Sequence, residues 1–213
     1  MQQAKGEHEP LDGIGDRLRE ERVRAGISQR ELARRLGLSP SLISQLESGQ
    51  SKPSVGTLYS IVTELGVSLD HVIRGSDHNA DGDGAGTASG GQDSPVGHPG
   101  ARAAIDLDSG VRWEELAPDD GENIDFLHVT YEVGGASTAD ESSIRHNGRE
   151  YGYVMSGTLG LRIGFQEHEL HPGDSIAFDS TIPHRLFNKG DVPVKAVWFV
   201  VGRDVGRRSP ESP

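Results

Sequence analysis

The stretch from residue 28 to residue 49 constrains the fold most, because it carries start and stop signals for two short helices in succession. Ser28 followed by Glu31 is a capping-box pattern, and Gly37 suits the left-handed residue that ends a helix. Ser39 and Pro40 place an N-cap before a proline at the first helical position. The sequence therefore predicts helices over residues 29–36 and 40–47, joined by a tight turn.

Apolar residues recur at three- and four-residue spacing on both sides of this stretch, the pattern of amphipathic helices. It predicts five helices, over residues 14–25, 29–36, 40–47, 54–65 and 68–73. The side chains expected to form their common core are Leu18, Val23, Leu32, Ala33, Leu36, Leu42, Ile43, Leu46, Leu58, Ile61, Val62, Leu65, Leu69 and Val72.

A stretch rich in Gly, Ala, Asp and Ser follows the helical part and has no apolar periodicity, so it predicts a flexible linker. Beyond it, short alternating runs punctuated by glycines predict β-strands. We therefore expect a multidomain protein, with an all-α five-helix domain over residues 11–75, a linker over 76–104 and an all-β domain over 105–203.

Charge is unevenly divided along the chain, whose formal net charge is −12. Residues 14–53 hold eight Lys or Arg against five Asp or Glu, whereas residues after 75 hold eleven against twenty-three. The basic part can still meet phosphate, because salt screens exposed charges within about 8 Å. The absence of cysteine excludes disulfides and thiolate zinc sites. No signal peptide and no apolar run of about 20 residues is evident, so we expect a cytoplasmic protein without a membrane partner.

The run from Ser28 to Gly49, SQRELARRLGLSPSLISQLESG, resembles the helix-turn-helix of phage-repressor regulators, the XRE or Cro/C1 family. The resemblance extends over residues 14–74. It implies a domain that binds duplex DNA and places its third helix in the major groove.

Helical spacing indicates which side chains of residues 40–47 could read bases. Leu42, Ile43 and Leu46 share the buried stripe, so Ser41, Ser44 and Gln45 lie opposite, with Ser48 beyond them. Gln45 can pair bidentately with adenine, and we expect it to carry most discrimination. Four residues, Gln29, Ser39, Ser51 and Lys52, are placed to donate to backbone phosphates, and Pro40 completes the set expected to bind DNA. The alternative is a solvated helix face in a structural or protein-binding bundle.

Two motifs in the second half resemble those of cupins. The first is His146-x₃-Glu150-x₆-Gly157, and the second joins Gly173-Asp174 to Pro183-His184-x₃-Asn188. The resemblance covers about residues 106–201 and implies a double-stranded antiparallel β barrel.

The cupin resemblance also implies a metal site, from which this sequence departs at one position. Ile144 stands where metal-binding cupins have the first His of a His-x-His pair, leaving His146, Glu150 and His184. These three have the composition of a facial triad for Fe(II), Zn or Mn. His146 and Glu150, four residues apart, would share a face of an extended segment if Gly148 introduced no bulge. The alternative is a set of hydrogen-bonded pocket groups without metal.

Together the two halves predict a ligand-responsive transcriptional regulator, in which a small molecule or metal in the cupin barrel modulates binding to operator DNA. We expect a homodimer through the cupin domain on a pseudo-palindromic operator. The alternative is a metal-dependent oxidase, because the hydroxypropylphosphonate epoxidases pair the same two domains and use a His/Glu/His iron triad. No catalytic residue beyond this triad can be identified by motif.

Overall fold

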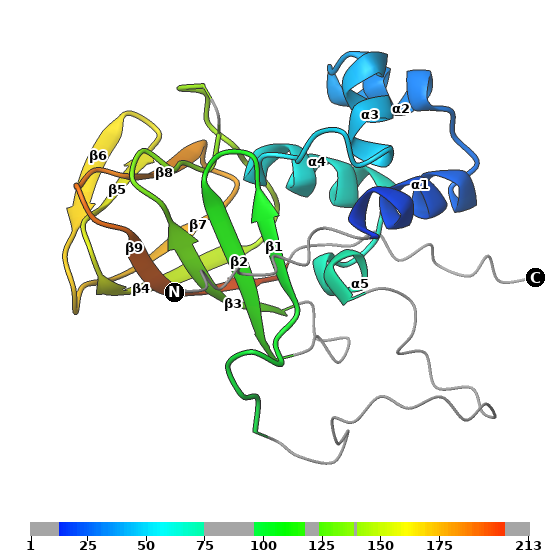
Figure 1. Cartoon of the computed structure of the whole chain (residues 1–213). Helices are drawn as coiled ribbons and strands as arrows, with labels where there is room; N and C mark the ends of the chain where they lie inside the picture. Colours follow the sequence, from blue (N-terminus) through cyan, green and yellow to red (C-terminus); the bar gives the residue numbers. More distant parts are fainter. Residues whose placement is uncertain (1–12, 75–95, 118–123, 139, 203–213) are drawn as a thin grey trace, which may run out of the picture.

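The computed structural model describes residues 13–74, 96–117, 124–138 and 140–202. Within these ranges the first part of the chain forms five helices (Figure 1): α1 Ile14–Arg24, α2 Gln29–Leu36, α3 Pro40–Glu47, α4 Val55–Leu65 and α5 Leu69–Arg74. The five predicted helices are confirmed, each end lying within one residue of its expected position.

The helix caps predicted for α2 and α3 are present in the structure. Ser28 Oγ accepts a hydrogen bond from the Glu31 N–H, and Gly37 ends α2 at φ 68°. Ser39 Oγ accepts from the Leu42 N–H, with Pro40 at the start of α3. These caps satisfy N–H groups at the helix starts that have no partner within the helix.

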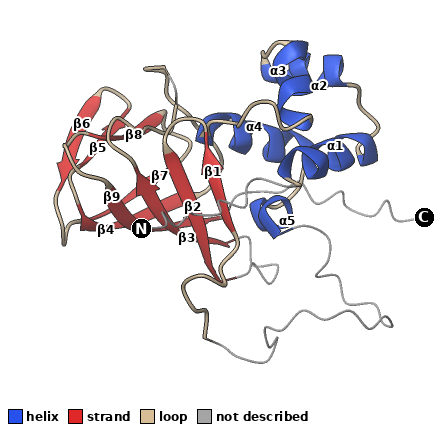
Figure 2. Cartoon of the chain, in the orientation of Figure 1, coloured by secondary structure: helices blue, strands red, loops and turns tan. Residues whose placement is uncertain are grey.

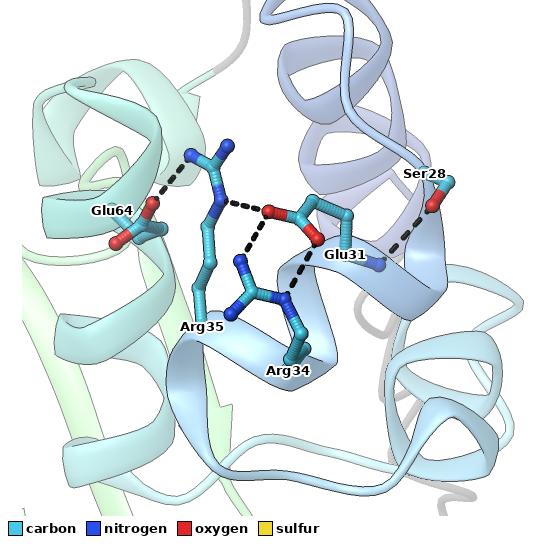
Figure 3. Close-up of polar contacts among 5 residues, drawn as sticks. All are labelled: Ser28, Glu31, Arg34, Arg35 and Glu64. Atoms are coloured by element: carbon cyan, nitrogen blue, oxygen red, sulfur yellow. Dashed lines mark hydrogen bonds and ion pairs between the residues drawn. The ribbon is translucent and has the colours of Figure 1, made fainter.

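In a capping box the Glu31 carboxylate would accept from the Ser28 N–H, but here it binds other partners (Figure 3). The carboxylate accepts from the Arg34 and Arg35 guanidinium groups, both within α2. Arg35 also donates to Glu64 Oε1 of α4 at 2.9 Å. The polar face of α2 is therefore tied to α4.

All the side chains expected in the helical core are buried or packed against it, except Val23. Leu36, Leu42 and Leu65 are partly buried and pack against the core. Val23 is 60% exposed, so its placement in the core was wrong. On α1 the buried stripe runs instead through Ile14, Leu18 and Arg22, at i and i+4 spacing, because the Arg22 stem and its ion pair occupy the inner face.

The second part of the described chain consists of strands and connecting loops (Figure 2). It forms two antiparallel sheets, of six strands in the order β1-β2-β3-β9-β4-β7 and three in the order β6-β5-β8. The strands are β1 Ala104–Leu107, β2 Val111–Ala117, β3 Ile124–Tyr131, β4 Arg149–Ser156, β5 Leu159–Ile163, β6 Gln166–Leu170, β7 Ser175–Asp179, β8 His184–Asn188 and β9 Val194–Val201. The all-β class is confirmed, while closure of the two sheets into one barrel stays a prediction.

The two halves contact each other directly, which the sequence did not indicate. The Gly56 N–H of α4 donates to the Ser137 carbonyl at 3.1 Å, and the Asp108 N–H donates to the Pro53 carbonyl at 3.0 Å. The Arg74 guanidinium of α5 contacts the Glu115 carboxyl of β2, with Nε to Oε2 at 2.5 Å. Residues 75–95, most of the predicted linker, lie outside the described residues, so the domain bounds stay predictions. None of the helices described is long and apolar enough to span a membrane.

Candidate nucleic-acid interface and metal centre

Helix α3 exposes the face predicted to read DNA. Ile43 and Leu46 are buried, whereas Ser41, Ser44 and Gln45 are exposed, as is Ser48 just after the helix. Figure 1 places α2 and α3 at the end of the helical domain away from the sheets. This face is therefore open to a partner, while its contacts with bases stay a prediction.

The residues expected at backbone phosphates differ in their surroundings. Pro40 and Ser39 are exposed, and Ser51 and Lys52 are half-buried. The Ser39 hydroxyl accepts the capping bond but keeps its own proton to donate. Gln29 Nε2 already donates to Glu47 Oε2 at 2.8 Å. The phosphate roles of Gln29, Ser39, Ser51 and Lys52 stay predictions, as does the DNA contact of Pro40.

Glu47 anchors helix α3 to the helical core rather than facing outward. Its carboxylate pairs bidentately with Arg22 of α1, with Nε to Oε1 at 2.5 Å and Nη2 to Oε2 at 2.9 Å. Both side chains are buried, and Arg22 Nη1 also donates to the Ile27 carbonyl. This planar pair fixes the orientation of α3 against α1.

Three side chains from separate segments meet within the cupin domain. His146 precedes β4, Glu150 lies in β4 and His184 begins β8. Glu150 Oε1 is 3.0 Å from His146 Nε2 and 2.9 Å from His184 Nε2, and all three atoms lie within 4.8 Å of one another. Ligands about 2.1 Å from one metal ion and at right angles stand roughly 3 Å apart, so these spacings fit a facial triad.

The hydrogen bonds around this cluster engage the other polar atoms of the three side chains, so the three converging atoms remain available to bind a cation. His146 Nδ1 lies 3.1 Å from the Asn147 carbonyl, and His184 Nδ1 lies 2.9 Å from the Ile182 carbonyl. A proton on each Nδ1 leaves each Nε2 with a lone pair. Trp198 Nε1 donates to the other oxygen of Glu150, Oε2, at 2.7 Å.

The cluster atoms themselves make no hydrogen bond of acceptable geometry to any described residue. His146 Nε2, Glu150 Oε1 and His184 Nε2 are all buried and face only one another. With a proton on each Nδ1 they are three buried acceptors in contact, which is costly. A divalent ion between them would satisfy all three. The residues present therefore fit a metal, and they could hold one.

The electrostatics of the cluster favour a bound cation. Burial raises the pKa of the Glu150 carboxyl, but the two neighbouring imidazoles outweigh burial and lower that pKa to about 2. Burial lowers the pKa of His184, but the adjacent Glu150 carboxylate raises that pKa by more, so the net shift is upward. Glu150 is thus an anion in a buried site.

The structure brings His146 and Glu150 together by a different route from the one expected. Gly148 takes φ 108°, and the chain bends at Asn147 and Gly148 before β4 begins. The extended-segment argument was therefore wrong, although the convergence that it predicted is confirmed. The bend turns His146 back over Glu150, and the His146 N–H is held by the Ser180 carbonyl at 3.0 Å.

Two aromatic residues of the site were missed by sequence reasoning. Trp198 of β9 orients Glu150, and it packs on Gly152, where an added Cβ would lie 2.0 Å from the indole ring. A glycine inside a strand pattern can mark such a close approach, so Gly152 was an available signal. Tyr59 of α4 stacks on His146, and no sequence signal pointed to it.

A five-helix domain with an exposed third helix, joined to an antiparallel domain with a buried His/Glu/His cluster, defines a two-domain DNA-binding protein. The helix-turn-helix family HTH_3 matches residues 18–72, and the cupin domain family Cupin_2 matches residues 127–200. The chain is thus a helix-turn-helix transcriptional regulator of the XRE type that carries a cupin domain on its C-terminal side.

Known proteins with the same arrangement are similar to this chain. The HTH-type transcriptional regulator PuuR of Escherichia coli K12 is 28% identical over 176 residues, covering 82% of this chain and 86% of PuuR. A crystal structure of an HTH_3 family transcriptional regulator from Vibrio cholerae aligns with a TM-score of 0.62 and 20% identity, covering 89% of this chain and 94% of that one. The hydroxypropylphosphonic acid epoxidase of S. wedmorenis aligns with a TM-score of only 0.43 at 19% identity, covering 88% of this chain and 96% of that one, too remote to bear on chemistry.

Proposed function

We propose that this regulator binds a specific duplex operator and that a divalent metal or small molecule in the cupin domain modulates this binding. One observation carries the proposal: the helix that abuts the His/Glu/His cluster, α4, belongs to the same helical domain as the exposed reading helix α3. A metal or small molecule bound at the cluster can therefore affect the DNA-binding domain through the direct contact with α4.

On the DNA side, Gln45 and Lys52 test the orientation of α3. Gln45→Ala should relax preference at one operator position by about 1–3 kcal/mol, because a bidentate contact to adenine is lost. Lys52→Ala should weaken binding evenly across operator variants and reduce the salt slope by about 1, because one phosphate contact is lost. The measurement is a binding titration over operator variants and salt concentrations.

Exposed Arg19 of α1 offers a control, since Arg19→Ala removes a positive charge outside the predicted DNA-binding set. Unchanged operator affinity and salt dependence in both Gln45→Ala and Lys52→Ala would show that α3 does not enter the groove as proposed.

On the cupin side, His146, Glu150 and His184 would hold Fe(II), Zn or Mn through two imidazoles and one carboxylate. Such an ion would supply a positive charge and open coordination positions for an effector. The chain's own contribution is orientation, because Trp198 and the two backbone carbonyls at the Nδ1 atoms fix the three ligands.

Trp198→Phe tests this orientation, because phenylalanine keeps an aromatic ring but has no N–H donor. Loss of the N–H donor should weaken Zn²⁺ binding by about 10–100-fold, the usual cost of losing a partner of a metal ligand. The measurement is calorimetric titration with Zn²⁺. Phe199→Leu, at the next residue of β9, is the control, since the Phe199 ring stacks on Phe126 instead of contacting Glu150. Equal affinity in the wild type and in Trp198→Phe would contradict the orienting role of Trp198, and a wild type that does not bind Zn²⁺ would contradict the metal assignment.

The same three ligands are also compatible with a metal-dependent oxidase. That function requires turnover: protein loaded with Fe(II) would consume oxygen in the presence of a substrate. Operator binding that responds to the metal, without turnover, supports the regulator instead.

We further propose that a second copy of the chain covers the outer face of the six-stranded sheet. Tyr151, Tyr153 and Met155 are exposed there on β4. Tyr151 pairs across with Phe199, whose ring stacks on Phe126 at 4.2 Å. A two-fold dimer through this aromatic face would present two reading helices to the half-sites of a pseudo-palindrome.

A further inference from the structure

Tyr59 lies against the candidate metal centre although it belongs to the DNA-binding domain. Its ring stacks on the His146 imidazole, with centroids 4.7 Å apart and planes inclined by 19°. Trp113 of β2 meets the same ring edge-on, with centroids 5.3 Å apart. Tyr59 is buried by these contacts, and its ring covers a face of a ligand imidazole.

The same face of α4 also contacts the segment that positions His184. Gly56, one helical turn before Tyr59, lies so close to Ile144 that an added Cβ would stand 2.4 Å from Ile144 Cγ2. Ile144 pairs with His184 through two backbone hydrogen bonds, of 2.9 and 2.8 Å. One turn of α4 therefore touches one ligand directly and the other through a single paired residue.

Helix α4 is also part of the helix-turn-helix core. Leu58, Ile61 and Val62 are buried among the other helices. The Arg35–Glu64 ion pair joins α4 to α2 at the surface (Figure 3). Because packed helices move as units, a change in the position of α4 must be passed to α2.

We propose that the metal centre is shared between the two domains. Tyr59 is a positioning residue that holds His146 in its ligating orientation, and a bound divalent cation fixes α4, and with it the DNA-binding domain, against the cupin domain. The consequence of this contact for operator binding rests on the proposed function, whereas the contact itself does not.

Zn²⁺ titration of the full chain tests the positioning role. Tyr59→Leu, which keeps apolar bulk but removes the ring, should bind Zn²⁺ about tenfold more weakly or worse. Tyr59→Phe keeps the stacked ring and should retain wild-type affinity. Thr63→Ala, at an exposed position of the same helix, is the matched control. Wild-type Zn²⁺ affinity in Tyr59→Leu would overturn the proposal.

Hydrogen exchange of the α4 amides tests the fixing of the helix. Zn²⁺ should slow exchange across α4 in the wild type and in Tyr59→Phe, and should not do so in Tyr59→Leu. Gly56→Ala gives a second variant that pushes α4 from Ile144 without changing Tyr59, and it should also lose the Zn²⁺-dependent protection. Exchange in wild-type α4 that is indifferent to Zn²⁺ would overturn the proposal.

Operator titration with and without Zn²⁺ separates this inference from the proposed function. In the wild type, operator affinity with Zn²⁺ and operator affinity without it should differ by about 5–150-fold. In Tyr59→Leu the two affinities should be nearly equal. If Zn²⁺ slows hydrogen exchange in wild-type α4 but does not change operator affinity, the shared centre is supported and the regulatory function is refuted. A Tyr59→Leu variant with the full difference in affinity would refute the coupling through Tyr59 and leave the regulatory function standing.

Discussion

Arg22 and Glu47 are charged residues that occupy core positions, and they show how a single pair can set the geometry of a DNA-binding face. Neither is more than a tenth exposed, and the two are joined by two hydrogen bonds with Gln29 as a third partner. A buried pair of this kind adds orientation more than net stability, because desolvation offsets most of the attraction.

Breaking the pair at one side should therefore be costly. Glu47→Ala leaves the Arg22 guanidinium buried without its partner and should lower the free energy of unfolding by about 3–5 kcal/mol. Urea unfolding followed by circular dichroism of the helices measures this. Glu64→Ala is the matched control, because its carboxylate pairs with Arg35 at the surface and should cost about 1 kcal/mol or less. Similar losses in the two variants would mean that the buried pair has no special role.

Helix α5 and strand β2 form a second junction between the two domains, and this junction is made by polar side chains. Arg74 of α5 contacts both Asp70 and Glu115. Burial, then the hydrogen bond and negative charge of Asp70, raise the pKa of Glu115 to about 9, although Arg74 opposes this shift. Near neutral pH the folded protein therefore keeps a proton on Glu115.

This proton makes the junction sensitive to pH. The unfolded chain releases it near pH 4.5, whereas the folded chain holds it to about pH 9. The stability that Glu115 contributes is therefore full below pH 4.5 and is lost as the pH rises through 9. Urea unfolding between pH 5 and 10 should show this decline, and Glu115→Gln should remove its part of the slope. Asp106→Asn, at an exposed pair with Arg112, should leave the slope unchanged; an unchanged slope in Glu115→Gln would contradict the assignment.

On the scale of the whole molecule, helix α3 and the strands that carry the aromatic face belong to different domains (Figure 1). The reading helix α3 lies at the far end of the helical domain, while β4, β9 and β3 carry the aromatic face. Direct contacts between the domains through α4 and α5 fix their separation, and a dimer would inherit it. Operator spacing would then follow from interdomain contacts as well as from the linker.

Tyr153, 49% exposed in the middle of β4, is the residue with which to test the dimer. Tyr153→Glu should give a monomer by light scattering, because a buried carboxylate without a partner disfavours the interface. It should also weaken binding to a two-half-site operator more than to a single half-site. Phe165→Glu, at the fully exposed turn between β5 and β6, is the matched control and should leave the mass unchanged. A wild-type monomer, on or off DNA, would rule out the dimer.

The sequence by itself determined the helix boundaries and the identity of the three candidate ligands. Caps and turns depend on residues within about four positions, so Ser28, Gly37 and Ser39 encode α2 and α3 locally. The motif around His146 and Glu150 identified two candidate ligands, and the second motif identified His184.

Only the tertiary structure decided how these pieces meet. Exposure of Val23, the bend at Gly148, the indole of Trp198 over Gly152 and the Tyr59 ring on His146 all depend on segments distant in sequence. Such contacts follow from the packing of a complete core, in which each side chain must fit the volume left by the others. Local sequence patterns do not encode that volume. The contact of the helical domain with the His/Glu/His cluster could therefore be seen only in the folded chain.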